Sequence, residues 1–390
     1  MPIDINIRNN YTTPVNLGSA RSLGAYGLRF STMLPGGCGE CTFNLPVSSF
    51  SAEDYLVPPS IWSYNNRVNL LDGGEMFWSG RMEDLQLHKG TDGIYWTIRS
   101  VGFGVNLMDQ VYTTQDVRNV ATGTVITNAV TSLAPQITAY SVSASGFTLS
   151  NVAAITLNTI SAGAVVAWAS RYGDSAFNPA QWYVYPDSDG TIRFTWEDRP
   201  TTAGIRALLA DFHEADFALY GKNLYNRIVS HTSGGSHVTR NNTTLQGGGE
   251  LGGWNVIKTF VAVLPETAQA ADHQQLGDAL LTQFGTPRIA ATSLRTQKAA
   301  DQLTMVDTYG RQVNPFRIRA GQLMQFMDMP TSAGLSNGIQ WANTFVVAGT
   351  DYDEDSQTLT ITPEGYDNSA DKLLAKVDYL LRGRLGLVSA

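Results

Sequence analysis

The sequence is poor in charge and in lysine. Charged side chains make up 15 % of its 390 residues, against roughly 25 % in a typical soluble domain. The 43 % hydrophobic and 10 % aromatic residues exclude a disordered chain, which is usually charge-rich and poor in aromatics. Of the 26 basic residues, 20 are arginine, which is favoured in interfaces because its guanidinium is weakly hydrated. GC-rich codon usage explains this bias about as well.

Long apolar runs and an excess of positive charge are also missing. No run of 18 apolar residues occurs, so we expect no membrane-spanning helix and no membrane insertion. The first residues, MPIDINIRNNYTT, have neither the charged nor the apolar region of a signal peptide, so none is expected. The formal net charge of −8 argues against a groove that neutralises nucleic-acid phosphates.

The two cysteines form a Cys38-Gly-Glu-Cys41 motif, which has the spacing of a redox or half-zinc site. A redox motif should open a helix, where the dipole lowers the thiol pKa. Here a Pro-Gly-Gly turn precedes the motif and a strand-like run follows it. No second cysteine pair or histidine pair completes a zinc site. We interpret Cys38 and Cys41 as ordinary cysteines at a turn, with a local disulfide as the alternative.

Three polar clusters remain as candidates for metal binding. His213 and Glu214, flanked by Asp211 and Asp216, form the densest cluster, but a metal would need a distant third ligand, so we interpret it as a solvated helix end or loop. The segments Asp187–Gly190 and Asp351–Asp355 lack the glycine and glutamate positions of a calcium loop and are interpreted as turns. A weak divalent-cation site at 351–355 stays open.

Catalytic signatures are absent as well. No GxSxG elbow, P-loop or GxGxxG motif opening a helix is present. Glu83-Asp84 and Glu197-Asp198 are carboxylate pairs, but neighbours on a strand are expected to point to opposite faces, which disfavours an acid/base pair. We therefore predict no enzymatic activity, no catalytic, cofactor-binding or metal-binding residue, and no cofactor.

The hydrophobic pattern predicts a mainly β fold with α+β parts. Ile3, Ile5 and Ile7 alternate with polar residues, and residues 75–88 and 94–101 form a predicted hairpin around a glycine-containing loop. Helices are predicted at 122–134, 161–172 and 265–284 and from Ser369 to the C-terminus, and a strand–turn–strand at 181–198. The polar stretch 232–253 is predicted to be a flexible loop.

The order of these segments resembles that of bacteriophage tail hub (baseplate hub) proteins. The segments that carry the resemblance are YGLRFSTMLPGGCGECTFNLPV, EMFWSGRMEDLQLHKGTDGIYWTIRSVGFGVNLMDQVY, the helix at 122–134, QWYVYPDSDGTIRF, NLYNRIVSH, the helix at 265–284, RIRAGQLMQFMDMP and VVAGTDYDEDSQTLTITPE. They are strand and turn patterns without a catalytic signature, so their order carries the resemblance, which extends to about residue 363.

The resemblance implies two related antiparallel β-barrels, α/β insert regions and a C-terminal helix. The expected limits are 1–118 for the first barrel domain, 119–215 for an α+β insert domain, 216–264 and 288–363 for the second barrel domain, 265–287 for a helical insert and 364–390 for the C-terminal helix. Members of the family form homotrimers, so six barrels in one ring adapt a six-fold tail tube to a three-fold tail tip.

The partners implied are therefore two other copies of the chain, a distal tail or tail tube ring, tail tip or fibre proteins, and DNA in transit. The implied location is the phage tail tip of a virion assembled in the host bacterial cytoplasm. A trimer would carry three times the formal charge of −8, or −24, and an acidic lumen would repel DNA phosphates. The alternatives are a distal tail protein, whose ring is hexameric, and a cell-wall glycan hydrolase or glycan-binding module.

Overall fold

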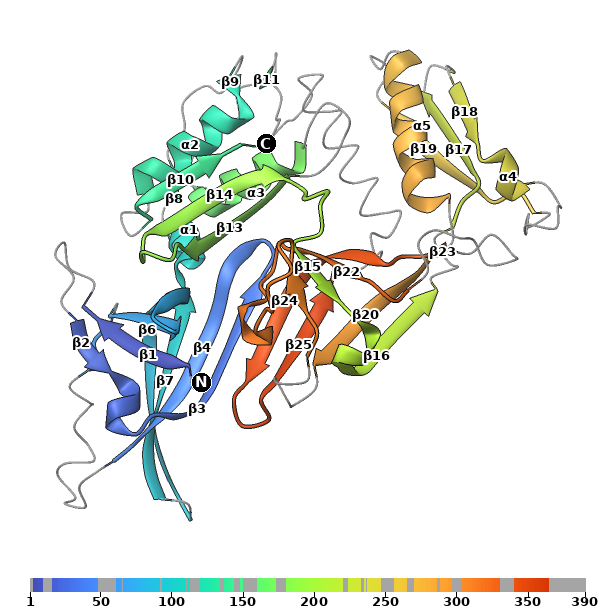
Figure 1. Ribbon diagram of the computed structural model, residues 1–390. Coiled ribbons are helices and arrows are strands. Elements are labelled where there is room, and N and C mark those ends of the chain that lie inside the picture. The colour runs from blue at the N-terminus through green and yellow to red at the C-terminus, as the bar shows by residue number, and fades with distance from the viewer. Residues whose placement is uncertain are drawn as a thin grey trace.

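The computed structural model of the chain describes residues 3–9, 16–47, 61–64, 66–91, 93–109, 111–112, 120–133, 137–143, 148–149, 160–172, 180–219, 224–232, 235, 237–246, 256–264, 270–285, 288–296, 303–329 and 340–364. Two β-rich regions lie side by side, and two smaller α/β units extend from them (Figure 1). None of the described helices is long and apolar enough to cross a membrane. The predicted C-terminal helix lies outside the described residues.

The first sheet comprises seven antiparallel strands in the order β2–β1–β5–β6–β7–β4–β3. Ile5 and Ile7 are fully buried, as their alternation predicts. The predicted hairpin is also confirmed. The bounds are β1 Asp4–Arg8, β2 Asn16–Ser19, β3 Tyr26–Met33, β4 Gly36–Pro46, β5 Arg67–Asp72, β6 Glu75–Gly90 and β7 Gly93–Gly102, with the 3-10 helix η1 at Ala20–Leu23.

Glycines allow the strands of this sheet to approach closely. Gly80 on β6 lies directly opposite Gly102 on β7. A Cβ atom at Gly102 would come closer than 3.0 Å to the carbonyl oxygen of Cys38 on β4. The glycines of the two segments WSGR and SVGF are therefore required by backbone packing.

The second sheet follows the order β21–β15–β22–β24–β25–β20–β16, with β23 beside β20. Phe326 lies in its core against the rings of Phe212, Phe217 and Phe345. The bounds are β15 Ile205–Ala207, β16 Phe212–Leu219, β20 Arg288–Thr296, β21 Val306–Asp307, β22 Leu323–Phe326, β23 Gln340–Trp341, β24 Thr344–Asp353 and β25 Thr358–Pro363, with η4 at Leu209–Asp211 and η6 at Pro315–Arg317.

The two sheets are continuous because β3 pairs with the last part of β24. Phe30 lies opposite Tyr352 in this antiparallel ladder, and the hydroxyls of Thr32 and Thr350 share a buried hydrogen bond of 2.6 Å. Among the described strands, no ladder joins β2 to β3 or β16 to β21, so neither sheet closes through backbone pairing within that part of the chain. A mainly β fold with α+β parts is confirmed.

The first α/β unit places two helices against the strands β10, β13 and β14. The predicted face of α2 is buried at Val125, Ile126, Ala129 and Val130. Ser161 caps α3, since its Oγ accepts a 3.1 Å hydrogen bond from the amide of Ala164, as predicted. The bounds are α1 Asn106–Asp109, β8 Val111–Tyr112, β9 Val120–Ala121, α2 Thr122–Leu133, β10 Ala139–Val142, β11 Thr148–Leu149, β12 Ile160–Ser161, α3 Ala162–Tyr172, β13 Ala180–Pro186 and β14 Ile192–Asp198, with η3 at Phe103–Val105.

The second α/β unit packs α5 (Ala270–Phe284) on a sheet of order β18–β17–β19. The strands are β17 Arg227–Thr232, β18 His237–Asn241 and β19 Thr259–Leu264, and a short helix α4 spans Thr243–Gln246. The prediction of a flexible loop over 232–253 is wrong for residues 237–241, where β18 pairs with β17 in full register, and for residues 243–246, which form α4. Strand β18 alternates exposed and half-buried residues, but only Val238 is apolar, so hydrophobic periodicity does not predict the strand.

The predicted domain limits stay a prediction. Within the range 119–215, β15 and the start of β16 pair with strands of the second sheet. The ladders therefore change from the first α/β unit to the second sheet before Ile205.

Candidate functional site

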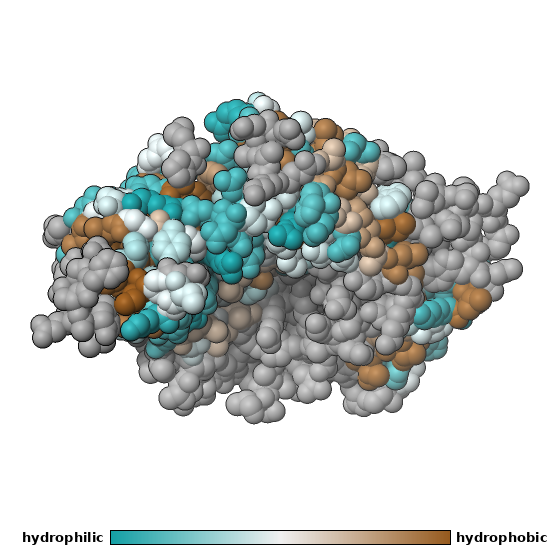
Figure 2. Space-filling view, turned by 90° about the horizontal axis from the view of Figure 1, so that it is seen from below, coloured by the Kyte–Doolittle hydropathy of each residue, from teal (hydrophilic) through white to brown (hydrophobic). Residues whose placement is uncertain are grey.

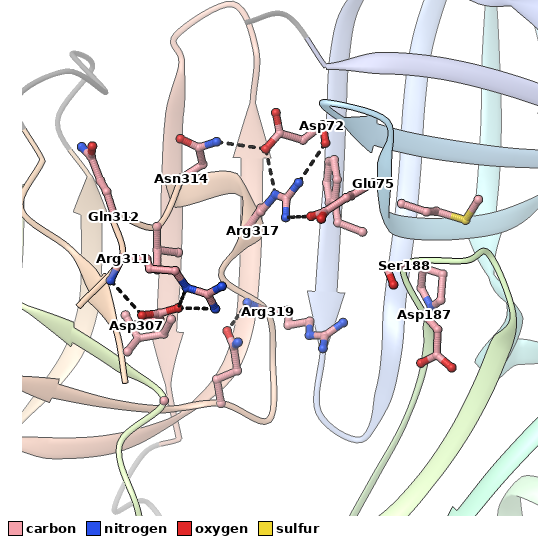
Figure 3. Close-up of a pocket in the computed structure, with 17 residues that line it drawn as sticks. Asp72, Glu75, Asp187, Ser188, Asp307, Arg311, Gln312, Asn314, Arg317 and Arg319 are labelled. Carbon is pink, nitrogen blue, oxygen red and sulfur yellow. Dashed lines mark hydrogen bonds and ion pairs between the residues drawn. The ribbon is translucent and has the colours of Figure 1, made fainter. Parts of the chain in front are cut away.

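A polar cleft of about 690 Å³ lies where the first sheet, the second sheet and the first α/β unit meet. The three walls come from the β5–β6 turn, the β13–β14 turn and the segment 307–322 (Figure 3). We call it the junction cleft.

Arg317 connects two walls of the junction cleft. Its guanidinium donates to Asp72 at 2.8 Å and to Glu75 at 2.6 Å, and Asn314 donates to Asp72 at 3.0 Å. Burial alone would lower the pKa of Arg317, but the hydrogen bond that Arg317 donates to Glu75 and the charge of Asp72 raise this pKa above its ordinary value. These contacts hold the β5–β6 turn against η6.

Arg67 connects the first sheet to the first α/β unit. It donates to Asn69, to Ser79 and, at 2.6 Å, to the carbonyl oxygen of Gly190 in the β13–β14 turn. Burial, and then the charge of Arg8, lower the pKa of Arg67 to about 10, so it remains charged at neutral pH. The predicted turn at Asp187–Gly190 is thus confirmed and serves as a contact between units.

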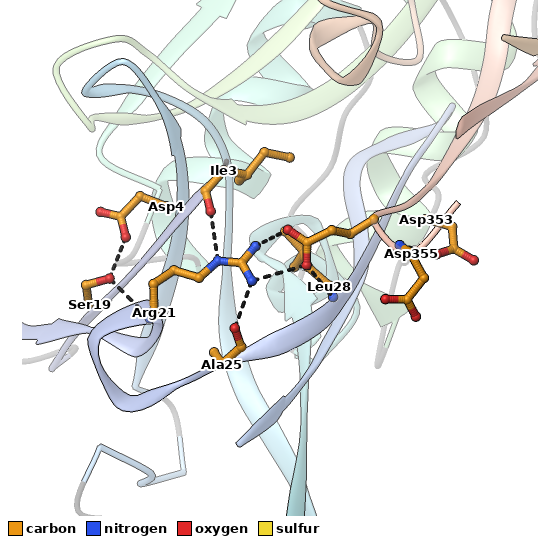
Figure 4. A network of polar contacts seen from close by, with 9 residues as sticks. Ile3, Asp4, Ser19, Arg21, Ala25, Leu28, Asp353 and Asp355 are labelled. Atoms are coloured by element: carbon orange, nitrogen blue, oxygen red, sulfur yellow. Dashed lines mark hydrogen bonds and ion pairs between the residues drawn. The ribbon is translucent and has the colours of Figure 1, made fainter. Parts of the chain in front are cut away.

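A third connection joins the β24–β25 turn to the first sheet (Figure 4). Arg21 pairs with both carboxylate oxygens of Glu354 and also donates to the carbonyl oxygens of Ile3 and Ala25 at 3.0 and 2.9 Å. Glu354 also accepts the amide of Leu28 at 3.1 Å. Because these partners are far apart in sequence, the network fixes the relative position of the two sheets.

An acidic strip crosses the strands β24, β3, β4, β7 and β6 on their solvent side. Its five carboxylates outnumber its three arginines. Arg29 pairs with Asp353 at 3.2 Å, Arg99 pairs with Glu40 and Asp84 at 2.9 and 2.8 Å, and Arg81 pairs with Glu83 at 2.8 Å. The strip consists of Glu40, Glu83, Asp84, Asp351 and Asp353 with the cations Arg29, Arg81 and Arg99. Such a surface repels phosphate.

The pKa of Asp351 responds to the other charges of the acidic strip. Burial raises the pKa of Asp351 above its ordinary value, Arg29 opposes this, and the charges of Asp353 and Glu40 add to it. Because the folded pKa lies above the unfolded one, the ionised form opposes folding, fully so at pH 7. We expect Asp351→Asn to raise Tm by roughly 1–2 °C at pH 7. This gain should shrink as the pH falls towards 4, where Asp351 is increasingly protonated.

Differential scanning calorimetry at several pH values measures this effect. Asp355→Asn, in the exposed turn that follows β24, is the matched control and should leave Tm unchanged. A decrease in Tm for Asp351→Asn at pH 7 would show that Asp351 stabilises the fold instead.

The carboxylate pair Glu83-Asp84 does not behave as predicted. Both carboxylates reach Arg99, at 3.8 and 2.8 Å, so they do not point to opposite faces. The reason is a β-bulge between Met82 and Asp84, which breaks the alternation of the strand. In the other pair, Glu197 accepts hydrogen bonds from Gln181 and Tyr183, both at 2.8 Å.

In the cluster around His213, the residues His213, Glu214 and Asp216 lie on the edge strand β16 and not on a helix end or loop, whereas Asp211 ends the 3-10 helix η4. His213 Nε2 lies 3.3 Å from Glu214, and both side chains are exposed. Asp211 is buried and accepts hydrogen bonds from the backbone amides of Leu208 and Thr304, which gives it a structural role. Among the described residues, no group of three histidine, cysteine or acidic side chains could hold a metal ion.

The segment Asp351–Asp355 and the two cysteines belong to strands or to the turn that follows β24. Asp351 and Asp353 belong to β24 itself, and the turn follows them, where Asp353 accepts the amide of Asp355 at 2.9 Å. Cys38 and Cys41 are free, buried thiols on β4. Burial raises the pKa of Cys38 to about 12, so the thiol is protonated and unreactive at neutral pH.

The fold is similar to that of solved tail proteins. A tail protein from Neisseria meningitidis MC58 matches with a TM-score of 0.55 at 10 % identity, over 93 % of this chain and 96 % of that one. The 43 kDa tail protein of prophage MuSo2 from Shewanella oneidensis gives 0.53 at 10 % identity, over 94 % and 99 %. Prophage tail protein gp18 from Listeria monocytogenes EGD-e gives 0.53 at 11 % identity, over 97 % and 99 %.

No protein-family profile and no curated protein sequence matches the chain. The similarity to these solved structures is therefore one of three-dimensional fold. The predicted resemblance to phage tail proteins is confirmed at this level.

Proposed function

We propose that this chain is a structural phage tail protein of the hub type, and that it has no enzymatic activity. Three copies form a ring that adapts the six-fold tail tube to the three-fold tail tip and encloses the path of the DNA. The observation that carries the proposal is the similarity of the fold to solved tail proteins over nearly the whole of both chains.

The arrangement of the two sheets supports this role. Each copy contributes two β-rich units held together by the β3–β24 ladder and by Arg21 and Arg317. Three copies thus provide six such units in one ring, which matches a six-fold neighbour while keeping three-fold symmetry towards the tip. A rigid connection between the units suits a ring that must keep this geometry.

The acidic strip supports passage of DNA. Exposed carboxylates that outnumber arginines give no binding site for phosphates, whereas an arginine-rich lumen would retain DNA through many phosphate contacts. We propose that the strip faces the lumen. The ring then guides DNA without holding it.

The remaining surface is suited to polar as well as apolar contacts. Figure 2 shows separate hydrophobic groups among hydrophilic residues on one face of the molecule. Such a mixture is typical of interfaces between subunits that assemble from folded copies. The partners proposed are two further copies, a distal tail or tail tube ring above and tail tip or fibre proteins below, in the virion after assembly in the host cytoplasm.

Native mass spectrometry of the purified chain tests the proposal. Three copies of the 42.3 kDa chain give about 127 kDa, which is the expected result. A mass of about 254 kDa, six copies, would instead indicate a hexameric ring of the distal tail type. A single copy that clears bacterial cell walls in a zymogram would contradict the structural role altogether.

A further inference from the structure

A second cavity, of about 370 Å³, lies at the N-terminus of helix α2 in the first α/β unit. Its walls include the first turn of α2 and Val142 at the end of β10. None of the described residues that line it carries a charge. Figure 1 shows this end of α2 beside β9 and away from the two sheets. We call it the α2 cavity.

The N-terminus of α2 differs from that of α3 in its capping. The first N–H groups of a helix have no partner within the helix, and they give this end a partial positive charge. In α3, Ser161 compensates by accepting the amide of Ala164. Ala121, which precedes α2, has no side-chain oxygen, and the first turn of α2 contains no acidic residue. The positive end of α2 is therefore left to a group from outside the helix.

Thr122, the first residue of α2, gives a second and independent indication of a ligand. It lines the cavity, and it is only 1 % exposed. Its hydroxyl is buried and has no hydrogen-bond partner, which costs free energy unless an acceptor is supplied. The hydroxyl of Thr127, in the same wall, shows the contrast, because it donates to the carbonyl oxygen of Gly123 at 2.8 Å.

These donors suit a phosphate group. Its oxygens accept several hydrogen bonds at once, and the N–H groups of a helix N-terminus favour its negative charge. Gly123 has no side chain to cover the backbone of the first turn, and a Cβ atom there would lie 3.1 Å from Val142. The described walls supply no carboxylate to hold a cation. The volume exceeds that of a phosphate group alone and leaves space for a small organic part.

We propose that the α2 cavity binds a phosphate group, either as free phosphate or as a phosphate monoester. The amides of the first turn of α2 and the hydroxyl of Thr122 donate to its oxygens. The site lies within a single copy of the chain, so it does not depend on the proposed ring. We expect a dissociation constant on the order of 1 mM, because the described walls supply no full positive charge.

Thr122→Val tests the site, because it keeps the shape of the side chain and removes only the hydroxyl. Titration calorimetry of the full chain with inorganic phosphate, at ionic strength held constant with sodium chloride, should show a dissociation constant at least about fivefold higher. Thr131→Val is the matched control, since Thr131 is exposed on the same helix and outside the cavity wall. Its dissociation constant should change less than about twofold. Equal affinities for the two variants would overturn the proposal.

Thr124→Glu gives a test that does not depend on Thr122. Thr124 is exposed in the first turn of α2, so the new carboxylate would compete with phosphate for the same amides. We expect Tm in phosphate-free buffer to rise by about 1–3 °C and phosphate binding to disappear. Thr124→Gln, the neutral control, should still bind. Undiminished binding by Thr124→Glu would refute the site.

Glycerol 3-phosphate, titrated beside inorganic phosphate, distinguishes the two forms of the ligand. A lower dissociation constant for glycerol 3-phosphate would assign the site to a monoester whose organic part contacts the wall. Equal dissociation constants would assign it to the phosphate group alone. Binding of neither compound to the original protein would overturn the proposal and leave the structural role in the tail untouched.

Discussion

Gly102→Ala is expected to destabilise the protein by about 3 kcal/mol or more, or to prevent folding. The added Cβ would come closer than 3.0 Å to the backbone carbonyl of Cys38, and a backbone atom cannot rotate away as a side chain can. Strands β7 and β4 would have to separate in the middle of the first sheet. Urea denaturation of the purified variant, followed by circular dichroism, measures the loss.

Gly90→Ala provides the control in the same hairpin. A Cβ at Gly90 would meet no atom within 4 Å, so its free energy of unfolding should stay within about 0.5 kcal/mol of the original. If Gly102→Ala were as stable as Gly90→Ala, the close approach of β7 to β4 would be disproved, and with it the architecture of the first sheet.

Phe326→Ala is expected to lower the free energy of unfolding by roughly 3–5 kcal/mol. Phe326 is 1 % exposed and packs between Phe212 and Phe345, with ring centroids 5.8 and 5.7 Å away. Its removal leaves a cavity among the rings of Phe212 and Phe217 on β16 and Phe345 on β24. The proposed ring of subunits should also lose rigidity, because β24 of this sheet pairs with β3 of the first sheet.

The exposed Tyr309 gives the comparison for this second variant. Its side chain is 82 % exposed, so Tyr309→Ala should change the free energy of unfolding by no more than about 0.5 kcal/mol. Calorimetry of both variants separates the two cases. Equal and small losses would mean that the aromatic cluster around Phe326 is not the core of this sheet.

Local hydrophobic patterns are sufficient to predict the strands that pair with the element next to them in the sequence. The alternation in residues 75–101 predicts the β6–β7 hairpin, and Ile192, Phe194 and Trp196 predict the buried face of β14, which is 0–2 % exposed. In these elements one face is apolar and the other polar, so periodicity carries the information.

Contacts between distant segments could not be predicted in this way. The β3–β24 ladder joins Thr32 to Thr350, and nothing in either segment specifies the other. The bulge that turns Glu83 and Asp84 towards Arg99 depends on the partner strand. The candidate surfaces are built from such distant pairs, which explains why the sequence pointed to a fold and not to a site.

The measurement closest to the central proposal is an electron cryo-microscopy reconstruction of the assembled ring. We expect three copies around one axis, six β-rich units in a single layer, and the carboxylates Glu40, Asp84 and Asp351 facing the central channel. A ring with one β-rich unit per copy around the channel would contradict the proposal. So would a lumen lined by arginines, with the acidic strip turned outward.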